Sequence, residues 1–133
     1  MTFIDASAYI AILNTHDSLH KKAVAILEVL VAKQEQVITS YAVLGEVLTV
    51  GSMRYDRQKT IAFVMAILES TTDVILEDQS ILEKAMTIFQ RIKNKNVSWI
   101  DCYSFAIIEQ HKIENVFSFD QDFIKHSGAA ILK

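Results

Sequence analysis

The sequence predicts one three-layer α/β/α domain with a parallel sheet of about five strands, and two patterns lead to this prediction. Short β-rich apolar runs alternate with longer segments in which apolar residues recur at helical spacing. No linker, internal repeat or low-complexity tract interrupts the 133 residues, a normal length for a single domain with a sizeable core. Strands separated by helices form βα units, which build a parallel sheet with helices on both faces. We therefore expect residues 1–133 to form one domain.

The elements follow from these patterns in chain order. The apolar runs predict five strands, at Thr2–Ile4, Gln36–Thr39, Asp73–Leu76, Asn115–Ser118 and Ala130–Leu132. The segments between them predict six helices, at residues 6–13, 18–33, 41–53, 57–70, 79–93 and 99–112. The second helix is the clearest, because its apolar stripe leaves most of its charged side chains on the opposite face. The short polar stretches 93–96 and 125–128 are expected to be loops.

Composition excludes several classes of protein. The single cysteine rules out an intrachain disulfide and a cysteine-rich zinc site. With only three glycines, the chain carries neither of the usual glycine-rich phosphate-binding motifs. The longest apolar runs, such as Ala23–Ala32, are too short to span a bilayer, and the start of the chain lacks the features of a secretory signal. We therefore expect a cytoplasmic protein that does not associate with membranes.

The charge of the chain leaves the kind of partner open. A formal net charge of −3 disfavours nucleic acid. If several acidic residues serve a metal centre, however, the remaining charge becomes slightly positive. Basic residues form two clusters, one of Arg54, Arg57 and Lys59 and one of Arg91, Lys93 and Lys95. Each cluster is either a solvated helix end or a contact for a polyanion.

Acidic residues follow two of the predicted strands. Asp5 ends the first strand, and Asp120 and Asp122 follow the fourth. In open parallel sheets, ligands bind beyond the carboxyl ends of the strands, where the strand order reverses. The alternative is structural: Asp5 would cap the next helix, and Asp120 and Asp122 would be turn residues. Both interpretations remain open for these three residues.

Two further acids lie in apolar helices. Glu46 is almost the only polar residue between positions 41 and 50, where a lone buried carboxylate would tend to protonate unless a cation pairs with it. Asp101 lies near the start of a strongly apolar helix, where it would also complete a capping box with Ser98. Several carboxylates that converge without a fixed cation repel one another, and a hard divalent cation removes that repulsion. An oxygen-only set of ligands indicates Mg²⁺ or Mn²⁺.

The acidic residues lie in four short sequence blocks, and the order and spacing of these blocks make the whole chain resemble a PIN-domain ribonuclease. The matching blocks are Phe3–Ser7, Thr39-Ser40 followed by Glu46, Ser98–Asp101 and Ser118–Phe123. The resemblance implies a sheet of order 3-2-1-4-5, which makes the strands that carry Asp5 and Asp120 neighbours. It also implies roles for the site residues: Asp5, Glu46, Asp101 and Asp120 as ligands of one or two Mg²⁺ or Mn²⁺ ions, Asp122 as an outer or second-ion ligand, and Ser7, Ser98 and Ser118 as hydroxyls that orient acids or waters.

The same resemblance implies a function. The activity would be metal-dependent hydrolysis of RNA phosphodiester bonds by a water molecule, which fits the absence of a nucleophilic side-chain constellation. The small size is most like the VapC-type toxins of toxin–antitoxin pairs, which implies a homodimer and a small antitoxin that blocks the acidic site. A stand-alone PIN nuclease of RNA processing is the alternative within the family.

Other interpretations receive less support from the residues. A signalling receiver domain would need a strand-end Lys beside its acidic pocket, and none is found. A catalytically silent interaction module would gain nothing from clustered carboxylates. His16 and His20 could suit zinc on one helix, but Asp17 and Ser18 are N-cap residue types, so His16 is expected to precede the helix. Trp99 and Phe105 are expected to be core residues rather than platforms for base stacking.

Overall fold

The computed structural model describes residues 1–76 and 78–132 and contains a five-stranded parallel sheet. Its strands lie in the order β3-β2-β1-β4-β5, which confirms the predicted fold class and strand order. The winding reverses between β1 and β4, where Thr2 pairs with Asn115 and Ile4 with Phe117. The strands are β1 (Thr2–Ile4), β2 (Val37–Ser40), β3 (Asp73–Ile75), β4 (Asn115–Phe117) and β5 (Ala130–Ile131).

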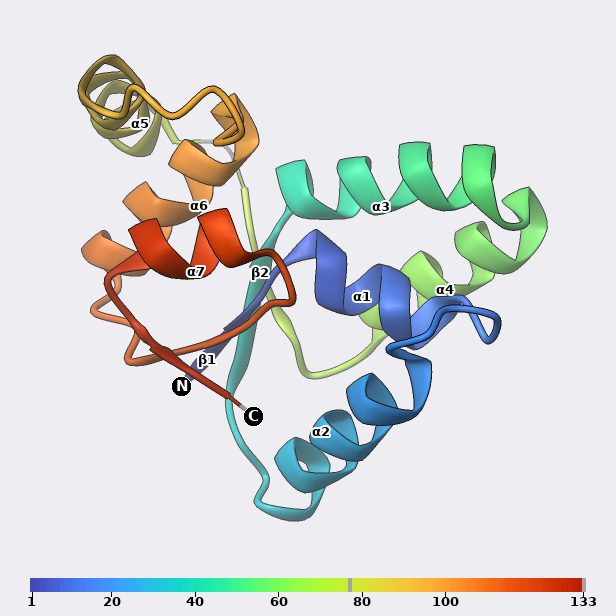
Figure 1. The fold of residues 1–133 in the computed structure, drawn as a ribbon. Helices are drawn as coiled ribbons and strands as arrows, with labels where there is room; N and C mark the ends of the chain where they lie inside the picture. Colours follow the sequence, from blue (N-terminus) through green and yellow to red (C-terminus); the bar gives the residue numbers. More distant parts are fainter. Residues whose placement is uncertain (77, 133) are drawn as a thin grey trace.

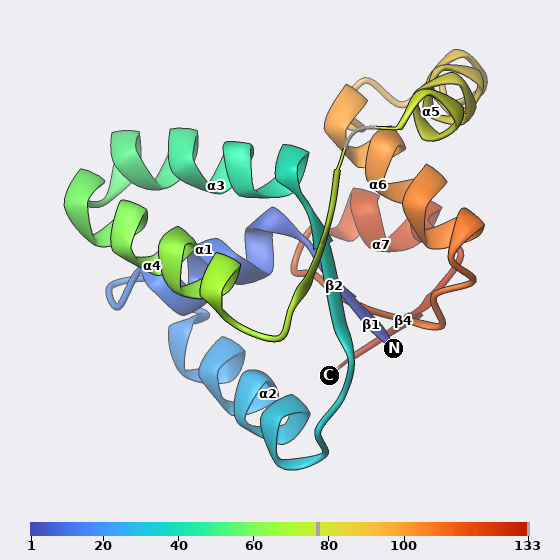
Figure 2. The same cartoon turned by 180° about the vertical axis from the view of Figure 1, so that it is seen from behind.

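Helices cover both faces of the sheet. Figures 1 and 2 show α1 to α4 on one side of the strands and α5 to α7 on the other. The helices are α1 (Ala6–Leu13), α2 (His20–Ala32), α3 (Tyr41–Arg54), α4 (Arg57–Glu69), α5 (Gln79–Arg91), α6 (Trp99–Gln110) and α7 (Gln121–Ser127). In the part of the chain that the structure describes, no helix combines the length and apolarity needed to cross a membrane.

Several predicted boundaries differ from the structure by one or two residues, and two differences have a clear local cause. Residues 125–127 belong to α7 rather than to a loop, because the Asp120 side chain caps the start of this helix and Gly128 ends it in the left-handed conformation with φ 71°. The second helix begins at His20 instead of residue 18. Asp17 does not cap it: its Oδ1 accepts the backbone N–H of Leu19 within the preceding turn, at 2.8 Å.

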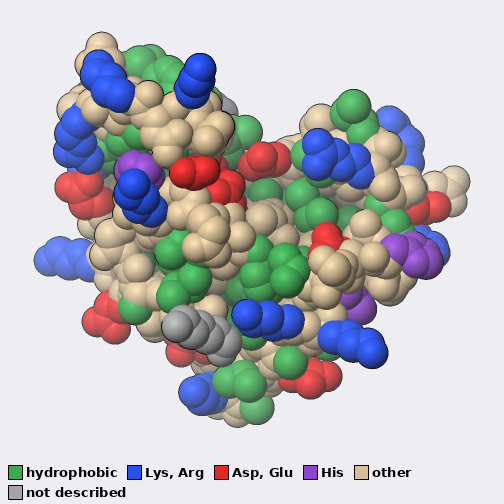
Figure 3. Space-filling model, in the orientation of Figure 1, with side chains coloured by type: hydrophobic (Ala, Val, Ile, Leu, Met, Phe, Trp, Pro, Cys, Tyr) green, Lys and Arg blue, Asp and Glu red, His purple; other side chains and the backbone are tan. Residues whose placement is uncertain are grey.

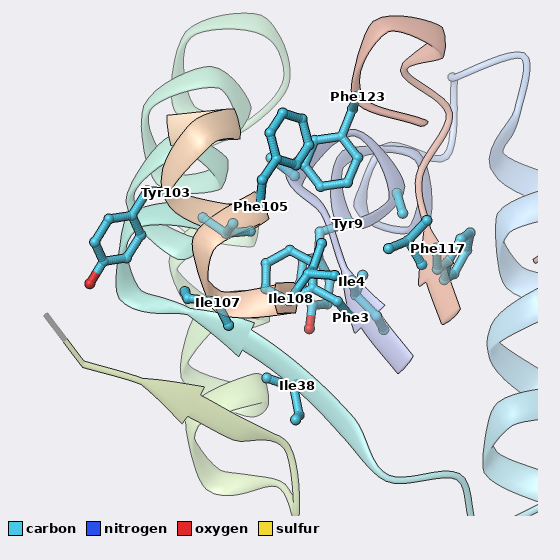
Figure 4. Packing of buried hydrophobic residues seen from close by; sticks show 14 of the residues in the cluster. Phe3, Ile4, Tyr9, Ile38, Tyr103, Phe105, Ile107, Ile108, Phe117 and Phe123 are labelled. Atoms are coloured by element: carbon cyan, nitrogen blue, oxygen red, sulfur yellow. The ribbon is translucent and has the colours of Figure 1, made fainter. Parts of the chain in front are cut away.

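Aromatic side chains connect the sheet to α6 and α7 near the carboxyl ends of β1 and β4. Phe123 of α7 is fully buried, stacks on Phe3 of β1 at 6.3 Å between ring centroids, and packs against Phe105 of α6 at 4.9 Å. Figure 4 shows Phe105 and Phe123 facing each other beside the strands. The core position predicted for Phe105 is confirmed, whereas Trp99 is only partly buried. Burial of Phe123 fixes α7, and with it the acids at the start of that helix.

Gly51 allows α3 and α4 to pack closely, and its replacement by Ala is expected to destabilise the fold. A Cβ at this position would lie 2.6 Å from Oγ1 of Thr60 and 3.1 Å from Cδ2 of Leu13. Thr60 is fully buried, and its hydroxyl donates to the carbonyl of Asp56 at 2.6 Å, so it has little freedom to move. Overpacking of this kind costs about 1–3 kcal/mol. Urea denaturation would measure the change.

Gly45 provides the matched control, since it lies in the same helix with no atom within 4 Å of a built Cβ. Gly45→Ala is expected to leave stability unchanged or to raise it by up to about 1 kcal/mol, the difference in helix propensity. Equal effects of the two substitutions would show that close packing at Gly51 does not limit stability.

Candidate active site

Four helices begin at the carboxyl-end edge of the sheet. α1, α3 and α7 follow β1, β2 and β4 closely, and α6 begins beside them. Helix N-termini carry a partial positive charge, which stabilises nearby carboxylates. Figure 3 shows acidic side chains gathered in the hollow between α3 and the part of the molecule formed by α5, α6 and α7. This edge is where the sequence analysis expects the site.

Asp5 is held by a hydrogen-bond network that links the ends of β1 and β4. Its Oδ2 accepts the hydroxyls of Ser7 at 2.8 Å and Ser118 at 2.9 Å. These hydroxyls in turn accept backbone N–H groups, Ser7 that of Phe119 at 3.0 Å and Ser118 that of Asp120 at 3.1 Å. Asp5 is 5% exposed, and burial raises the pKa of its carboxyl despite these bonds. The two serines therefore fix both the carboxylate of Asp5 and the backbone at Asp120.

Asp120 and Asp122 lie at the start of α7 but have different surroundings. Oδ1 of Asp120 caps the helix, accepting the N–H groups of Asp122 at 2.9 Å and Phe123 at 3.2 Å. Oδ1 of Asp122 instead accepts a hydrogen bond from Nδ2 of Asn94, at 2.8 Å, in the loop before α6. Asn94 was not singled out in the sequence, where the stretch 93–96 shows only the composition of a loop.

Asp101 occupies the third position of α6 and completes a capping box with Ser98. The hydroxyl of Ser98 accepts the N–H of Asp101 at 3.1 Å, and Oδ2 of Asp101 accepts the N–H of Ser98 at 2.9 Å. Burial, together with the charges of Asp5 and Asp120, raises the pKa of Asp101 to about 6. The capping interpretation is therefore confirmed, and the same carboxylate also lies near the other acids.

Glu46 projects from the second turn of α3 toward the other acids. Burial and the charges of Asp5, Asp101 and Asp120 raise its pKa to about 7. No hydrogen bond or ion pair with another described residue compensates its carboxylate. The effect of three separate carboxylates on one pKa shows that the four acids, which come from β1, α3, α6 and the start of α7, occupy one region. Asp122 is not among the charges that shift Glu46 or Asp101.

The donor set fits a hard divalent cation. All candidate ligands are carboxylates, and the ion pairs within the described residues, Met1 with Glu35 and Lys84 with Glu109, lie outside the cluster. No three His, Cys, Asp or Glu side chains in the described ranges converge closely enough to enclose an ion as they stand. Carboxylates gathered in one region repel one another, and a divalent cation would remove that repulsion.

Ser118→Ala is expected to weaken the site without unfolding the protein. The change removes one of the two hydroxyl donors to Asp5 and the acceptor for the backbone N–H of Asp120, so both acids are held less firmly. Loss of such an orienting group typically costs 10–100-fold in metal affinity or activity, here about 10-fold or more. Titration with Mn²⁺ would measure it. Ser127→Ala is the control, because Ser127 is also buried but donates to Ile124; a similar loss there would exclude a specific role for Ser118.

Comparison with known proteins agrees with this geometry. The family model of the PIN domain matches residues 2–129. The chain is 29% identical over 123 residues, 92% of each protein, to the 23S rRNA-specific endonuclease VapC20 of Mycobacterium tuberculosis. The crystal structure of that sarcin-ricin loop cleaving toxin superimposes with a TM-score of 0.85 at 27% identity, covering 98% of this chain and 97% of the other.

More distant structures share the fold. The FitAcB structure from Neisseria gonorrhoeae gives a TM-score of 0.69 at 17% identity and covers 100% of this chain and 97% of the other. A toxin–antitoxin complex from Klebsiella pneumoniae gives 0.68 at 19%, with the same coverage. The family match over nearly the whole chain, the strand order and the acids at the carboxyl-end edge lead to one conclusion: this chain belongs to the PIN domain family, as a VapC-type member.

Proposed function

We propose that this chain is a divalent-metal-dependent endoribonuclease and the toxin of a toxin–antitoxin pair, with residues 1–133 acting as one nuclease domain. The observation that supports the proposal is the clustering of Asp5, Glu46, Asp101 and Asp120 without an ion pair to any described basic residue, at the point where the winding of a PIN-domain sheet reverses. The similarity to an RNA-cleaving relative supports the same reaction class.

In this proposal Asp5, Glu46, Asp101 and Asp120 would hold Mg²⁺ or Mn²⁺, and Asp122 would be an outer or second-ion ligand. The bound ion would supply electrostatic stabilisation of the phosphoryl group and a lowered pKa for water. The protein's own contribution is positioning: Ser7 and Ser118 fix Asp5, and the capping bonds fix Asp101 and Asp120. One carboxylate accepts the proton of the attacking water, whose oxygen displaces the leaving ribose oxygen from phosphorus.

Ribosomal RNA is the substrate class that we propose to test first, because the relative at 29% identity is named for cleavage of 23S rRNA. Such a substrate also implies a cytoplasmic location. Messenger and transfer RNA serve as comparison substrates.

The proposed partners are an antitoxin and a second copy of the chain. An apolar groove of about 560 Å³ lies between α2 and α4, away from the acids, and would suit an apolar segment of the antitoxin. Its lining includes Leu30, Val31, Phe63 and Ile67. Co-expression with a short protein encoded beside this gene, followed by co-purification, tests the pair. Val31→Asp, at an exposed position in the groove, is expected to weaken binding of the antitoxin.

The test of the activity is cleavage of intact ribosomes and of purified RNA in Mg²⁺ or Mn²⁺, with and without EDTA. We expect a limited set of fragments whose formation requires the ion. A folded protein that cleaves none of these RNAs under any of these conditions, or cleaves equally in EDTA, would contradict the proposal and favour a silent interaction module.

A further inference from the structure

An aromatic pair lies at the junction of α5 and α6. Phe89 of α5 is 44% exposed and packs against the partly buried Trp99 in an edge-to-face arrangement, with 5.9 Å between ring centroids and an angle of 87°. Figure 3 shows exposed hydrophobic side chains over α5, bordered by Lys and Arg side chains. Contiguous exposed apolar patches that are rimmed by polar residues often mark interaction sites, whereas single exposed hydrophobic residues are ordinary.

The indole of Trp99 keeps its hydrogen-bonding capacity. Its Nε1–H donates to no acceptor among the described residues, and this atom is not among the buried polar atoms without a partner, which are Tyr9 Oη and Ser104 Oγ. The N–H therefore reaches solvent. Trp99 thus presents an apolar ring and a free donor at the surface, two residues before Asp101.

The loop between α5 and α6 ties this pair to the acidic site. The side chain of Asn94 donates to Asp122 at 2.8 Å and accepts the N–H of Asn96 at 2.9 Å, while the Asn94 carbonyl accepts the N–H of the buried Val97 at 3.1 Å. Asn94 and Val97 are therefore held in place within the loop. Lys95 lies between these anchors, is exposed, and forms no ion pair within the described chain.

We propose that Phe89, Lys95 and Trp99 form a subsite for an unpaired RNA nucleotide beside the cleaved bond, an inference that rests on the proposed function. The base stacks on the aromatic pair, the indole N–H donates to it, and Lys95 neutralises its phosphate. Unpaired bases stack readily on aromatic side chains, whereas the bases of a helix are already stacked. The subsite therefore makes the enzyme select RNA loops over duplexes.

The cationic border favours RNA over a protein as the occupant. Arg91, Lys93 and Lys95 flank the aromatic pair within a few residues, a charge that complements a phosphate backbone. The hydrogen bond from Asn94 to Asp122 also connects the loop before Trp99 to the start of α7, which Asp120 caps. A protein partner on the exposed apolar face of α5 is the competing outcome.

The fluorescence of Trp99 gives a direct test, because it is the single tryptophan of the chain. The wild-type protein is titrated in EDTA, which prevents cleavage, with three probes: a short single-stranded RNA, the same RNA as a duplex, and an abasic ribose-phosphate chain of equal length. We expect quenching by the single strand, with binding roughly tenfold tighter than for the duplex or the abasic chain.

Three variants separate the contributions: two are compared by KM in cleavage assays with the metal present, and the third by the salt dependence of binding in EDTA. Phe89→Leu keeps an apolar side chain but removes the ring, and we expect KM for a loop RNA to rise roughly tenfold with little change in kcat. Met86→Ala, one turn earlier on the same exposed face, is the control and should leave KM unchanged. Lys95→Gln should reduce the slope of log Kd against log salt by about 0.7, the value for one phosphate contact on a single strand.

The outcomes distinguish this subsite from the proposed function. Wild-type cleavage with unchanged KM in Phe89→Leu, and no quenching by RNA, would overturn the subsite and leave the nuclease intact. Equal quenching by the abasic chain would also overturn it. If Phe89→Leu and Met86→Ala both change the sedimentation of the protein while KM stays constant, the face is a protein interface. Absence of any wild-type cleavage would contradict the proposed function itself.

Discussion

Asp5→Asn is expected to reduce RNA cleavage by at least about 100-fold, since loss of groups that merely orient a metal ligand already costs up to that factor. Asn keeps the size of the side chain and can still cap α1, because its carbonyl oxygen replaces the carboxylate as acceptor. The negative charge is lost, and one of the two oxygens that could bind a cation becomes an NH2 group. The initial rate of cleavage in Mg²⁺ or Mn²⁺, with circular dichroism to verify the fold, measures the effect.

Asp56→Asn is the matched control, because Asp56 caps α4 in the same way, accepting the N–H of Lys59, but lies outside the acidic cluster. It should cleave at the wild-type rate. Equal rates for wild type, Asp5→Asn and Asp56→Asn would mean that the acidic cluster does not catalyse the reaction, or that the observed cleavage comes from a contaminating nuclease.

The second large effect concerns stability and its dependence on pH without a divalent ion. The pKa of Glu46 is about 7 in the folded chain and about 4.5 in an ordinary glutamate, so between these values the folded state binds more protons than the unfolded state. Stability therefore falls as pH rises through this window. Asp101, whose pKa is raised from 3.8 to about 6, adds a similar fall in stability that begins near pH 3.8. Glu46→Gln removes the first contribution and should flatten the dependence.

Divalent ions should reverse this loss. An ion that binds only the folded state at 100 times its Kd adds about 2.7 kcal/mol of stability. For a chain of this size, that corresponds to a rise in Tm on the order of 5–10 °C. Thermal denaturation with Mg²⁺ or Mn²⁺ at pH 7.5 and at pH 5, with NaCl of equal ionic strength as control, measures the shift. It should be larger at pH 7.5, since protons compete with the ion for Glu46 and Asp101. An equal shift with NaCl would indicate general screening instead of a site.

Most of the fold could be predicted because each of the first six helices is long enough to show its own apolar period. α7 has only seven residues, less than two helical turns, so periodicity could not identify it. The sequence indicates this helix only through single residues: Asp120 caps its start, Gly128 ends it, and Phe123 is its buried side chain. The polar composition of residues 125–128 outweighed them. The predicted start of α2 is too early because Asp is a common N-cap residue, whereas the Asp17 side chain here accepts the N–H of Leu19 within the preceding turn.

The candidate site was predictable where an acid stood in an unsuitable environment, as Glu46 does in an apolar helix. For Asp5, Asp101 and Asp120, the sequence left capping and site membership as alternatives; the structure shows each residue in a capping interaction and also near Glu46, while their role in a site stays a prediction. The role of Asn94 could not be predicted. Its bond to Asp122 joins loops 28 residues apart, and no local pattern specifies that contact.

The bond between Ser118 and Asp5 spans 113 residues, so the acidic cluster draws on nearly the first and nearly the last element of the fold. During synthesis the N-terminal part of a chain is available for folding first. A nascent chain that has made β1 to β3 and α1 to α6 still lacks Asp120 and the serine that fixes Asp5. The acidic cluster is therefore complete only after β4 and the start of α7 have been made, so the shorter nascent chain lacks the full set of carboxylates.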